Sequence, residues 1–173
     1  MITVIIGTNR PDSNSQIVAD AYCRILSELG VDNSQLKLID LPHEFVFADM
    51  YGQRTETMKT MINSLIDPVD KFVFIIPEYN GSFAGVLKSF LDCVPPSSWH
   101  GKKAGLIGIS SGAAGSLRGM DQFTNILNYL KVSVLYSKPK LSGIENILGS
   151  ERKLEDENVI AMLKEHATLI HGF

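Results

Sequence analysis

The chain has 173 residues, of which 45% are hydrophobic and 20% are charged, and its formal net charge is −3. This length suits one domain over residues 1–173, and the apolar content is enough for a sizeable core. No basic stripe points to a nucleic-acid partner, and no apolar run approaches the roughly 20 residues that cross a bilayer.

Apolar runs and helical patterns alternate along the whole chain. Short continuous apolar runs are typical of strands buried on both faces, and apolar residues three and four apart are typical of helices. In chain order we predict a strand at 2–6, a helix at 15–29, a strand at 36–41, a helix at 55–66, a strand at 71–76, a helix at 86–94, a strand at 104–109, a helix at 117–130, a strand at 132–136 and a helix at 154–170.

This alternation with short connections predicts an α/β fold in three layers, with helices on both faces of a parallel sheet. Five strands joined by right-handed crossovers suit the flavodoxin-like strand order 2-1-3-4-5. In such sheets, ligands bind beyond the carboxyl ends of the strands, at the switch point between strands 1 and 3. We therefore expect the functional site in the loops after strands 1, 3 and 4.

The loop after strand 1 is dense in hydroxyl and amide side chains and leads directly into a helix N-terminus. The N–H groups and dipole at such a terminus favour an anion. Thr8, Ser13 and Ser15 can donate to phosphate oxygens, and Arg10 can add a charge-assisted contact, with Asn14 between the two serines. The alternative is a capping box over 13–16, which needs no ligand. The place of this loop in an α/β sheet favours phosphate.

Other nucleotide-binding motifs fit the chain poorly. The sequence contains neither the GK[ST] of a P-loop nor a G-x-G-x-x-G run after strand 1. Asp40 ends the second predicted strand, where a dinucleotide fold places its ribose-binding acid. Without the glycines, we interpret Asp40 as an ordinary residue at a strand end.

Two further loops carry residues suited to a flat heterocycle. Strand 3 ends in four residues, of which Tyr79 can form a wall and Asn80 can hydrogen-bond a polar ring edge; the four are Pro77, Glu78, Tyr79 and Asn80. Strand 4 ends in the small residues Ser110, Ser111 and Gly112, which let a ligand approach the backbone. Each loop could instead be a plain strand–helix connection. Their convergence with the first loop favours a binding site.

With these motifs, the sequence resembles the NADPH-dependent FMN reductase family, which includes flavodoxin-like quinone, azo-compound and chromate reductases. The family motif G-S-x-R-x-x-S-x-N reads GTNRPDSNS here, with Thr8 and Ser15 as substitutions. The motif PEYN is intact at 77–80, and Ala84 stands where the family typically has a proline. The resemblance extends over nearly the whole chain.

The resemblance implies that the FMN phosphate binds residues 8–15 and that the isoalloxazine lies against 77–80 and 110–112. It implies an oxidoreductase that passes electrons from NADPH or NADH through FMN to a small acceptor such as a quinone. It also implies a homodimer or homotetramer. Because flavin carries the redox chemistry itself, no catalytic side chain is assigned.

Two alternatives remain open. The first is an FMN-binding electron carrier that does not react with nicotinamide, although carriers tend to show a strong field of one sign. The second is an interaction module that keeps the fold and has lost the cofactor, against which the intact PEYN and Arg10 argue.

Several residues outside these loops receive structural interpretations. Lys88 and Asp92 are expected to form a surface pair, and Trp99 and His100 to lie on the surface or contact a partner. The apolar segment 41–55 could cap the substrate pocket, meet a second subunit or cover the sheet edge. Neither the histidines nor the cysteines have metal-ligand spacing, and Cys23 and Cys93 are interpreted as small buried hydrophobes. No secretion signal is recognised, so we expect a cytoplasmic protein.

Overall fold

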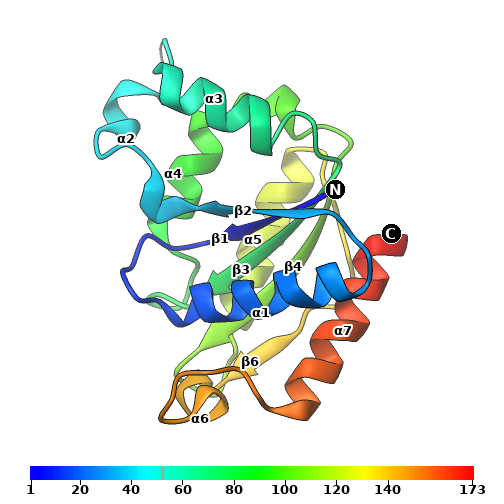
Figure 1. Ribbon diagram of the computed structural model, residues 1–173. Helices are drawn as coiled ribbons and strands as arrows, with labels where there is room; N and C mark the ends of the chain where they lie inside the picture. Colours follow the sequence, from blue (N-terminus) through cyan, green and yellow to red (C-terminus); the bar gives the residue numbers. More distant parts are fainter. Residues whose placement is uncertain (52) are drawn as a thin grey trace.

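A computed structural model describes residues 1–51 and 53–173. Its centre is a parallel sheet in the order β2-β1-β3-β4-β5, with β6 also paired to β4 (Figure 1). The strands are β1 (Ile2–Ile6), β2 (Asn33–Lys37), β3 (Lys71–Pro77), β4 (Lys103–Ser110), β5 (Ser133–Val134) and β6 (Lys140–Ser142). The predicted flavodoxin-like α/β fold and its strand order are therefore confirmed.

Helices cover both faces of the sheet (Figure 1). One face is covered by α3 (Glu56–Leu65), α4 (Gly85–Cys93) and α5 (Leu117–Tyr129), and the other by α1 (Asn14–Glu28) and α7 (Glu157–Gly172). These five helices confirm the predicted ones, with ends displaced by a few residues. Two short α-helices, α2 (Phe45–Ala48) and α6 (Ile144–Leu148), and two 3-10 helices, η1 (Leu38–Asp40) and η2 (Pro96–Ser98), were not predicted.

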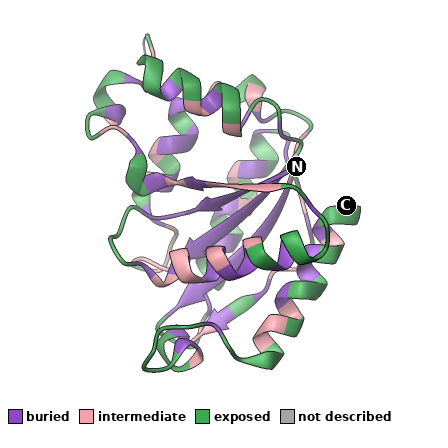
Figure 2. Cartoon of the chain, viewed as in Figure 1, coloured by how far each residue is buried: buried purple, intermediate pink, exposed green. Residues whose placement is uncertain are grey.

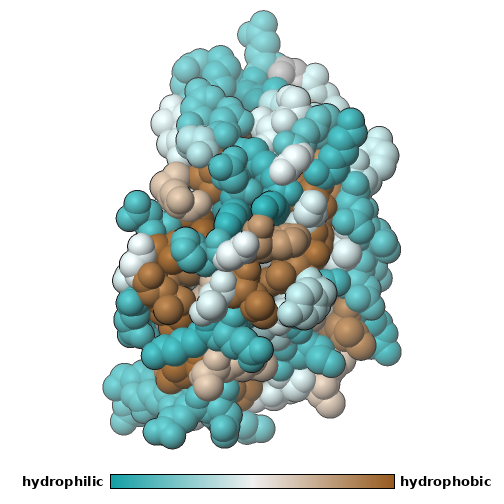
Figure 3. Space-filling view, turned by 90° about the vertical axis from the view of Figure 1, so that its right-hand side faces the viewer, coloured by the Kyte–Doolittle hydropathy of each residue, from teal (hydrophilic) through white to brown (hydrophobic). Residues whose placement is uncertain are grey.

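Side chains of the central strands alternate between two hydrophobic cores, because successive residues of a strand point to opposite faces. In β3, Phe74 packs into the core under α3, α4 and α5, whereas Val73 and Ile75 pack into the core under α1 and α7. Both sets are fully buried. The central strands are accordingly buried along their length, while exposed residues lie mainly on the outer sides of the helices (Figure 2). On the surface, the face near the chain termini shows several apolar areas that are separated by hydrophilic residues (Figure 3).

The second strand was misplaced by the sequence pattern. It was predicted at 36–41, but β2 spans Asn33–Lys37 and pairs with β1, and η1 follows it. β2 is the edge of the sheet, and its first three residues are polar and half-buried, so they lack the apolar run of a central strand. Asp40 ends η1 and is exposed.

The predicted strand 132–136 is replaced by two short strands along the outer edge of β4. β5 pairs with Lys103–Ala104, and β6 pairs with Gly108–Ser110. Between them the chain leaves the sheet, with Tyr136 82% exposed, and rejoins it where the carbonyl of Pro139 accepts from the Gly108 N–H. A proline provides no N–H for a ladder, so the pattern did not indicate β6.

Trp99 was expected at the surface, and this was wrong. Its side chain is fully buried and packs against Phe72, with ring centroids 5.2 Å apart. It lies in the core between η2 and β4, although the adjacent His100 is exposed as predicted. The loop position suggested exposure, but the space left under β3 and α4 requires a large apolar side chain.

The remaining structural predictions are confirmed in part. Lys88 Nζ lies 2.6 Å from Asp92 Oδ2 in an exposed pair, as predicted. Both cysteines are free; Cys93 is buried as predicted, whereas Cys23 is only half-buried. In the segment 41–55, Phe45 joins the core, which supports the sheet-covering interpretation; residue 52 lies outside the described residues.

Candidate functional site

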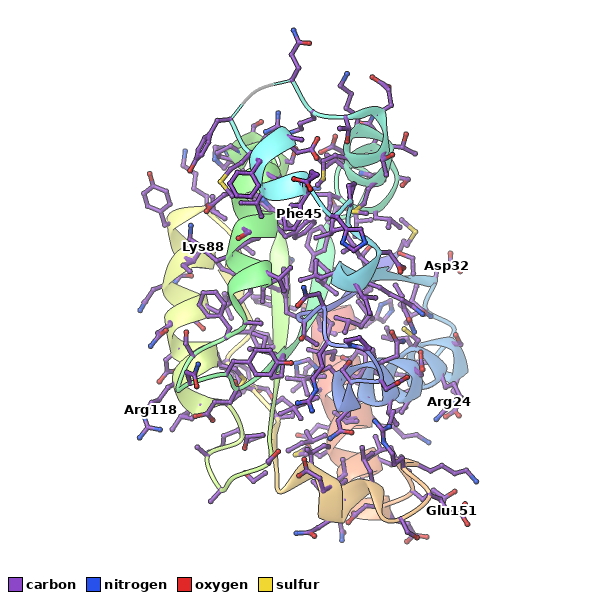
Figure 4. All side chains as sticks on the ribbon, turned by 90° about the vertical axis from the view of Figure 1, so that its left-hand side faces the viewer. Arg24, Asp32, Phe45, Lys88, Arg118 and Glu151 are labelled. Carbon is purple, nitrogen blue, oxygen red and sulfur yellow. The ribbon has the colours of Figure 1, made fainter. Side chains whose placement is uncertain are left out.

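A cavity of about 400 Å³ lies where β1, β3 and β4 end. Figure 4 faces this edge of the sheet, with Arg118 of α5 and Glu151 beyond α6 on opposite sides. The cavity is lined by predicted site residues from all three loops: Arg10, Ser13, Asn14, Ser15, Pro77, Glu78, Tyr79, Ser110 and Ser111. Thr8, Asn80 and Gly112 do not line it.

The loop between β1 and α1 starts at a close approach of two strands. A Cβ on Gly7 would lie 2.6 Å from the Ile75 carbonyl oxygen, so only glycine fits there without a shift. Ser13 has an extended backbone, and its Oγ accepts from the Gln16 N–H at 3.3 Å as the N-cap of α1. The Gln16 side chain donates to Asp20 and Gln35 instead of returning to Ser13. Only half of the capping box forms.

Capping and anion binding are compatible in this geometry. A hydroxyl has one donor and two acceptor sites, so Ser13 can accept from Gln16 and still donate into the cavity. The N–H groups of Asn14 and Ser15, in the first turn of α1, have no acceptor within the helix. Arg10 is exposed at the cavity and takes part in no ion pair within 4.0 Å among the described residues. The start of α1 thus presents hydrogen-bond donors and a positive charge to the cavity.

Thr8 lies beneath the cavity rather than in its wall. Its side chain is buried, and its Oγ1 is 2.8 Å from the Tyr79 hydroxyl and accepts from the Arg10 N–H at 3.1 Å. Thr8 therefore joins the loop after β1 to the loop after β3 and fixes the position of the Tyr79 side chain. The hydroxyl predicted to meet phosphate is used within the protein.

Asn80 and Gly81 form a tight two-residue turn. Both have positive φ values, 52° and 77°, and the backbones of Tyr79 and Ser82 exchange two hydrogen bonds across them. Asn-Gly is the pair that favours such a hairpin turn. The Asn80 side chain is exposed away from the cavity. Its contribution here is to the backbone that presents Tyr79.

Glu78 lines the cavity and also stabilises the neighbouring helix. Its Oε2 accepts from the Ser116 N–H at 3.1 Å, at the N-terminus of α5. A carboxylate is favoured at that position by the helix dipole. This contact gives Glu78 a structural role.

The loop after β4 is organised by Ser110. Its Oγ donates to the Gly112 carbonyl at 2.6 Å and accepts from the Gly115 N–H at 2.8 Å. The Gly112 carbonyl also accepts from the Gly143 N–H at 3.1 Å. Gly112 thus shapes the loop, while Ser110 and Ser111 face the cavity.

The sequence interpretation missed one wall of the cavity. Ile144 and Glu145 of α6, and Arg152 beyond it, line the cavity opposite the predicted loops, and Pro11, Asp12 and Ile109 complete the lining. Glu145 Oε1 accepts from the Ser111 hydroxyl at 2.7 Å, and this hydrogen bond lowers the pKa of Glu145, with a smaller effect of the Arg10 charge. No motif marks these residues, because they lie in a short glycine-bounded helix and the loop after it.

The described residues contain no group of three or more His, Cys, Asp or Glu side chains that could hold a metal ion. Within residues 1–51 and 53–173, none of the helices has the length and apolar character needed to cross a bilayer.

Comparison with known proteins places the chain among flavin enzymes. The sequence model of the NADPH-dependent FMN reductase family matches residues 1–141. The chain is 28% identical over 167 residues to an NAD(P)H-dependent FMN reductase of Pseudomonas aeruginosa, covering 93% of this chain and 88% of that protein. It is 29% identical over 166 residues to a quinone reductase of Pseudomonas putida, covering 90% and 85%.

Solved structures show the same fold. FerB, a flavoenzyme NAD(P)H:(acceptor) oxidoreductase of Paracoccus denitrificans, superposes with a TM-score of 0.80 at 23% identity, covering 99% of this chain and 97% of that one. A flavodoxin of Pseudomonas aeruginosa superposes with a TM-score of 0.65 at 16% identity, covering 99% of each chain. The family match, which spans most of the chain, shows that this protein belongs to the NADPH-dependent FMN reductase family, oxidoreductases that work with FMN and NAD(P)H.

Proposed function

We propose that the cavity at the ends of β1, β3 and β4 is the FMN site of a single-domain NAD(P)H-dependent reductase. One observation carries this proposal: a single cavity joins the hydroxyl-rich start of α1 to Pro77, Glu78 and Tyr79 of the PEYN motif at the end of β3. These are the two segments by which the chain resembles its family. The loop after β4 completes the same cavity.

The residues present fit the two chemically different parts of FMN. Toward a phosphate, the cavity offers the Arg10 guanidinium, the hydroxyls of Ser13 and Ser15, and the first N–H groups of α1. Toward a flat ring, it offers the side chains of Pro77 and Tyr79 and the backbone around Ser110. A volume of about 400 Å³ lies within the usual range for small-ligand sites.

We assign the remaining predicted site residues to support of this cavity. Thr8 holds the Tyr79 side chain, Asn80 forms the turn behind it, and Gly112 shapes the loop after β4. When bound, FMN supplies hydride acceptance from the nicotinamide and electron donation to a small acceptor. The residues at the start of α1 would hold its phosphate, and Pro77, Tyr79 and the backbone around Ser110 would orient its ring. Relatives named quinone reductases support a quinone-type acceptor for this chain.

Titration of FMN with the apoprotein, followed by quenching of flavin fluorescence, tests the site. We expect saturable quenching near one FMN per chain at micromolar concentrations. Arg10→Ala removes the charge-assisted contact and should weaken binding about tenfold. Arg24→Ala is the matched control, because Arg24 is an exposed arginine of α1 outside the cavity (Figure 4). Absence of quenching well above micromolar concentrations would contradict the proposal.

The same sample separates a reductase from an electron carrier. A reductase consumes NADPH or NADH continuously when a quinone is present, and its bound flavin is bleached by the nicotinamide alone. Bound flavin that stays oxidised in excess NADPH and NADH would identify a carrier.

We further propose that the protein forms a homodimer or homotetramer. Three large side chains, Phe47, Tyr51 and Tyr129, are 90%, 92% and 85% exposed. Tyr51 and Tyr129 line a second cavity, of about 720 Å³, between the segment after α2 and helices α4 and α5. Exposed apolar patches of this kind mark interaction surfaces. Sedimentation as a monomer at micromolar concentration would contradict this assembly.

We place the protein in the cytoplasm. Its two cysteines, Cys23 and Cys93, are free thiols, as is usual where glutathione keeps thiols reduced. Recovery in a secreted or periplasmic cell fraction would overturn this assignment.

A further inference from the structure

The segment 142–153 passes across the candidate site and is fastened to the loop after β4. The Gly143 N–H donates to the Gly112 carbonyl at 3.1 Å, and the Ser142 hydroxyl donates to the Ala113 carbonyl at 2.8 Å. Glu145 accepts from Ser111 as described above. These contacts hold the segment against one of the three loops of the cavity.

The far end of the same segment is fastened to the loop after β1. Arg152 Nη2 donates to the Asp12 carbonyl at 2.6 Å and to Asn14 Oδ1 at 3.1 Å. Asp12 has a φ of 50°, a left-handed backbone conformation that costs free energy in a residue other than glycine. The Arg152 guanidinium therefore donates to the carbonyl of Asp12, the strained residue in the loop that leads into α1.

The backbone around Arg152 is fixed rather than free to follow the side chain. The Arg152 N–H donates to the Gly149 carbonyl at 3.2 Å, and the Lys153 N–H donates to the Leu148 carbonyl at 3.0 Å. Leu148 and Leu154, on either side of this turn, are buried in the core under α1 and α7. The guanidinium thus projects from an anchored turn onto the α1 start.

We propose that Arg152 is a positioning residue for the phosphate end of FMN: its guanidinium fixes the Asp12–Asn14 backbone so that the first N–H groups of α1 and the Ser13 and Ser15 hydroxyls face the phosphate. This inference rests on the proposed FMN site. Arg152 lies beyond residues 1–141, the part of the chain that matches the family model. It predicts that Arg152 favours the phosphorylated flavin over riboflavin, which lacks the phosphate.

Binding of FMN and of riboflavin to the full-length wild type, Arg152→Ala and Arg152→Lys tests the inference. Arg152→Ala should weaken FMN binding about tenfold, because the two hydrogen bonds that hold the start of α1 in place are lost, and should change riboflavin binding less than about twofold. Arg152→Lys should resemble Arg152→Ala, because both contacts are made by Nη2, which lies one bond farther from the backbone than a lysine Nζ can reach. Lys153→Ala is the matched control: it removes the same charge from the next residue, which pairs with Glu151 away from the cavity lining.

Hydrogen exchange of the ligand-free proteins gives a readout that does not depend on flavin. The Gln16 amide, which donates to Ser13, should exchange faster in Arg152→Ala than in the wild type and in Lys153→Ala. Thermal stability should change little, because Arg152 is exposed. Unchanged exchange overturns the positioning role, and so does a variant that binds FMN like the wild type. Full FMN affinity in Arg152→Lys, or equal losses for FMN and riboflavin, also overturns it. A wild type that binds no FMN instead overturns the proposed function, and this inference with it.

Discussion

The two faces of the central sheet are packed with different chemistry. Under α3, α4 and α5, the buried side chains are mostly apolar and aromatic, with Trp99 in contact with Phe72, Phe74 and Phe90 at centroid distances of 5.2–6.4 Å. Under α1 and α7, the apolar core contains one fully buried histidine, His166. The first face is held mainly by the shape of its apolar side chains, with the buried side chains of Thr3 and Asp49 hydrogen-bonded at the ends of α3. The second face also contains an imidazole whose protonation state changes in acid.

His166 is accommodated by two residues of neighbouring elements. Its Nδ1 is 2.7 Å from the Tyr22 hydroxyl of α1, and its ring lies against Gly105 of β4, where a Cβ would be only 2.7 Å from the imidazole Cε1. Nε2 is buried without a hydrogen-bond partner among the described residues. Burial lowers the pKa of His166 to about 4, so the ring is neutral at pH 7.

The largest effect is expected from truncating the aromatic face. Trp99→Ala should destabilise the protein by about 3–5 kcal/mol, because it removes a fully buried ring and leaves a cavity. Chemical denaturation at pH 7 measures the change. Trp99→Phe should cost less, because it keeps most of the volume and removes an indole N–H that has no partner among the described residues.

Tyr129→Ala is the control for this prediction, since Tyr129 is 85% exposed and should contribute within about 0.5 kcal/mol. FMN affinity should be unchanged in Trp99→Phe, because Trp99 does not line the cavity. A loss of less than about 1 kcal/mol in Trp99→Ala would show that the face repacks and that shape is not its main requirement.

The same contrast explains what the sequence could predict of the fold. β3 and β4 are buried on both faces and therefore show as continuous apolar runs. β2 lies at the edge and begins with Asn33, so its pattern is polar and its position was misjudged. Trp99 was assigned to the surface because a local pattern does not reveal which loop residue fills a gap between other elements.

The candidate site likewise has one part that the sequence predicts and one part that it does not. The loops after β1, β3 and β4 are contiguous motifs at strand ends, so topology alone brings Arg10, Tyr79 and Ser110 together. The opposite wall depends on contacts between residues distant in the chain, such as Arg152 with Asp12. No local spacing encodes a contact of this kind, and the short α6 that carries Glu145 gives little periodic signal.

A smaller effect, confined to acid pH, should come from the polar face. The folded pKa of about 4 lies below the ordinary value of 6.5, so at intermediate pH the unfolded chain binds a proton that the folded chain does not. Protonation of His166 in the unfolded chain therefore lowers the free energy of unfolding in acid. This loss is absent above about pH 6.5, grows as the pH falls, and levels off below about pH 4 near 3 kcal/mol.

Denaturation of the wild type and His166→Gln at several pH values between 7 and 4 isolates this contribution. Carboxylates titrate in both proteins, so the informative quantity is the difference between their unfolding free energies. Between pH 7 and pH 4, the unfolding free energy of His166→Gln should rise by about 3 kcal/mol relative to that of the wild type, because glutamine cannot be protonated there. His100→Gln, which removes an exposed histidine, should follow the wild type. If His166→Gln loses stability with pH as steeply as the wild type, the two faces of the sheet respond alike to acid, and the buried imidazole is not what distinguishes them.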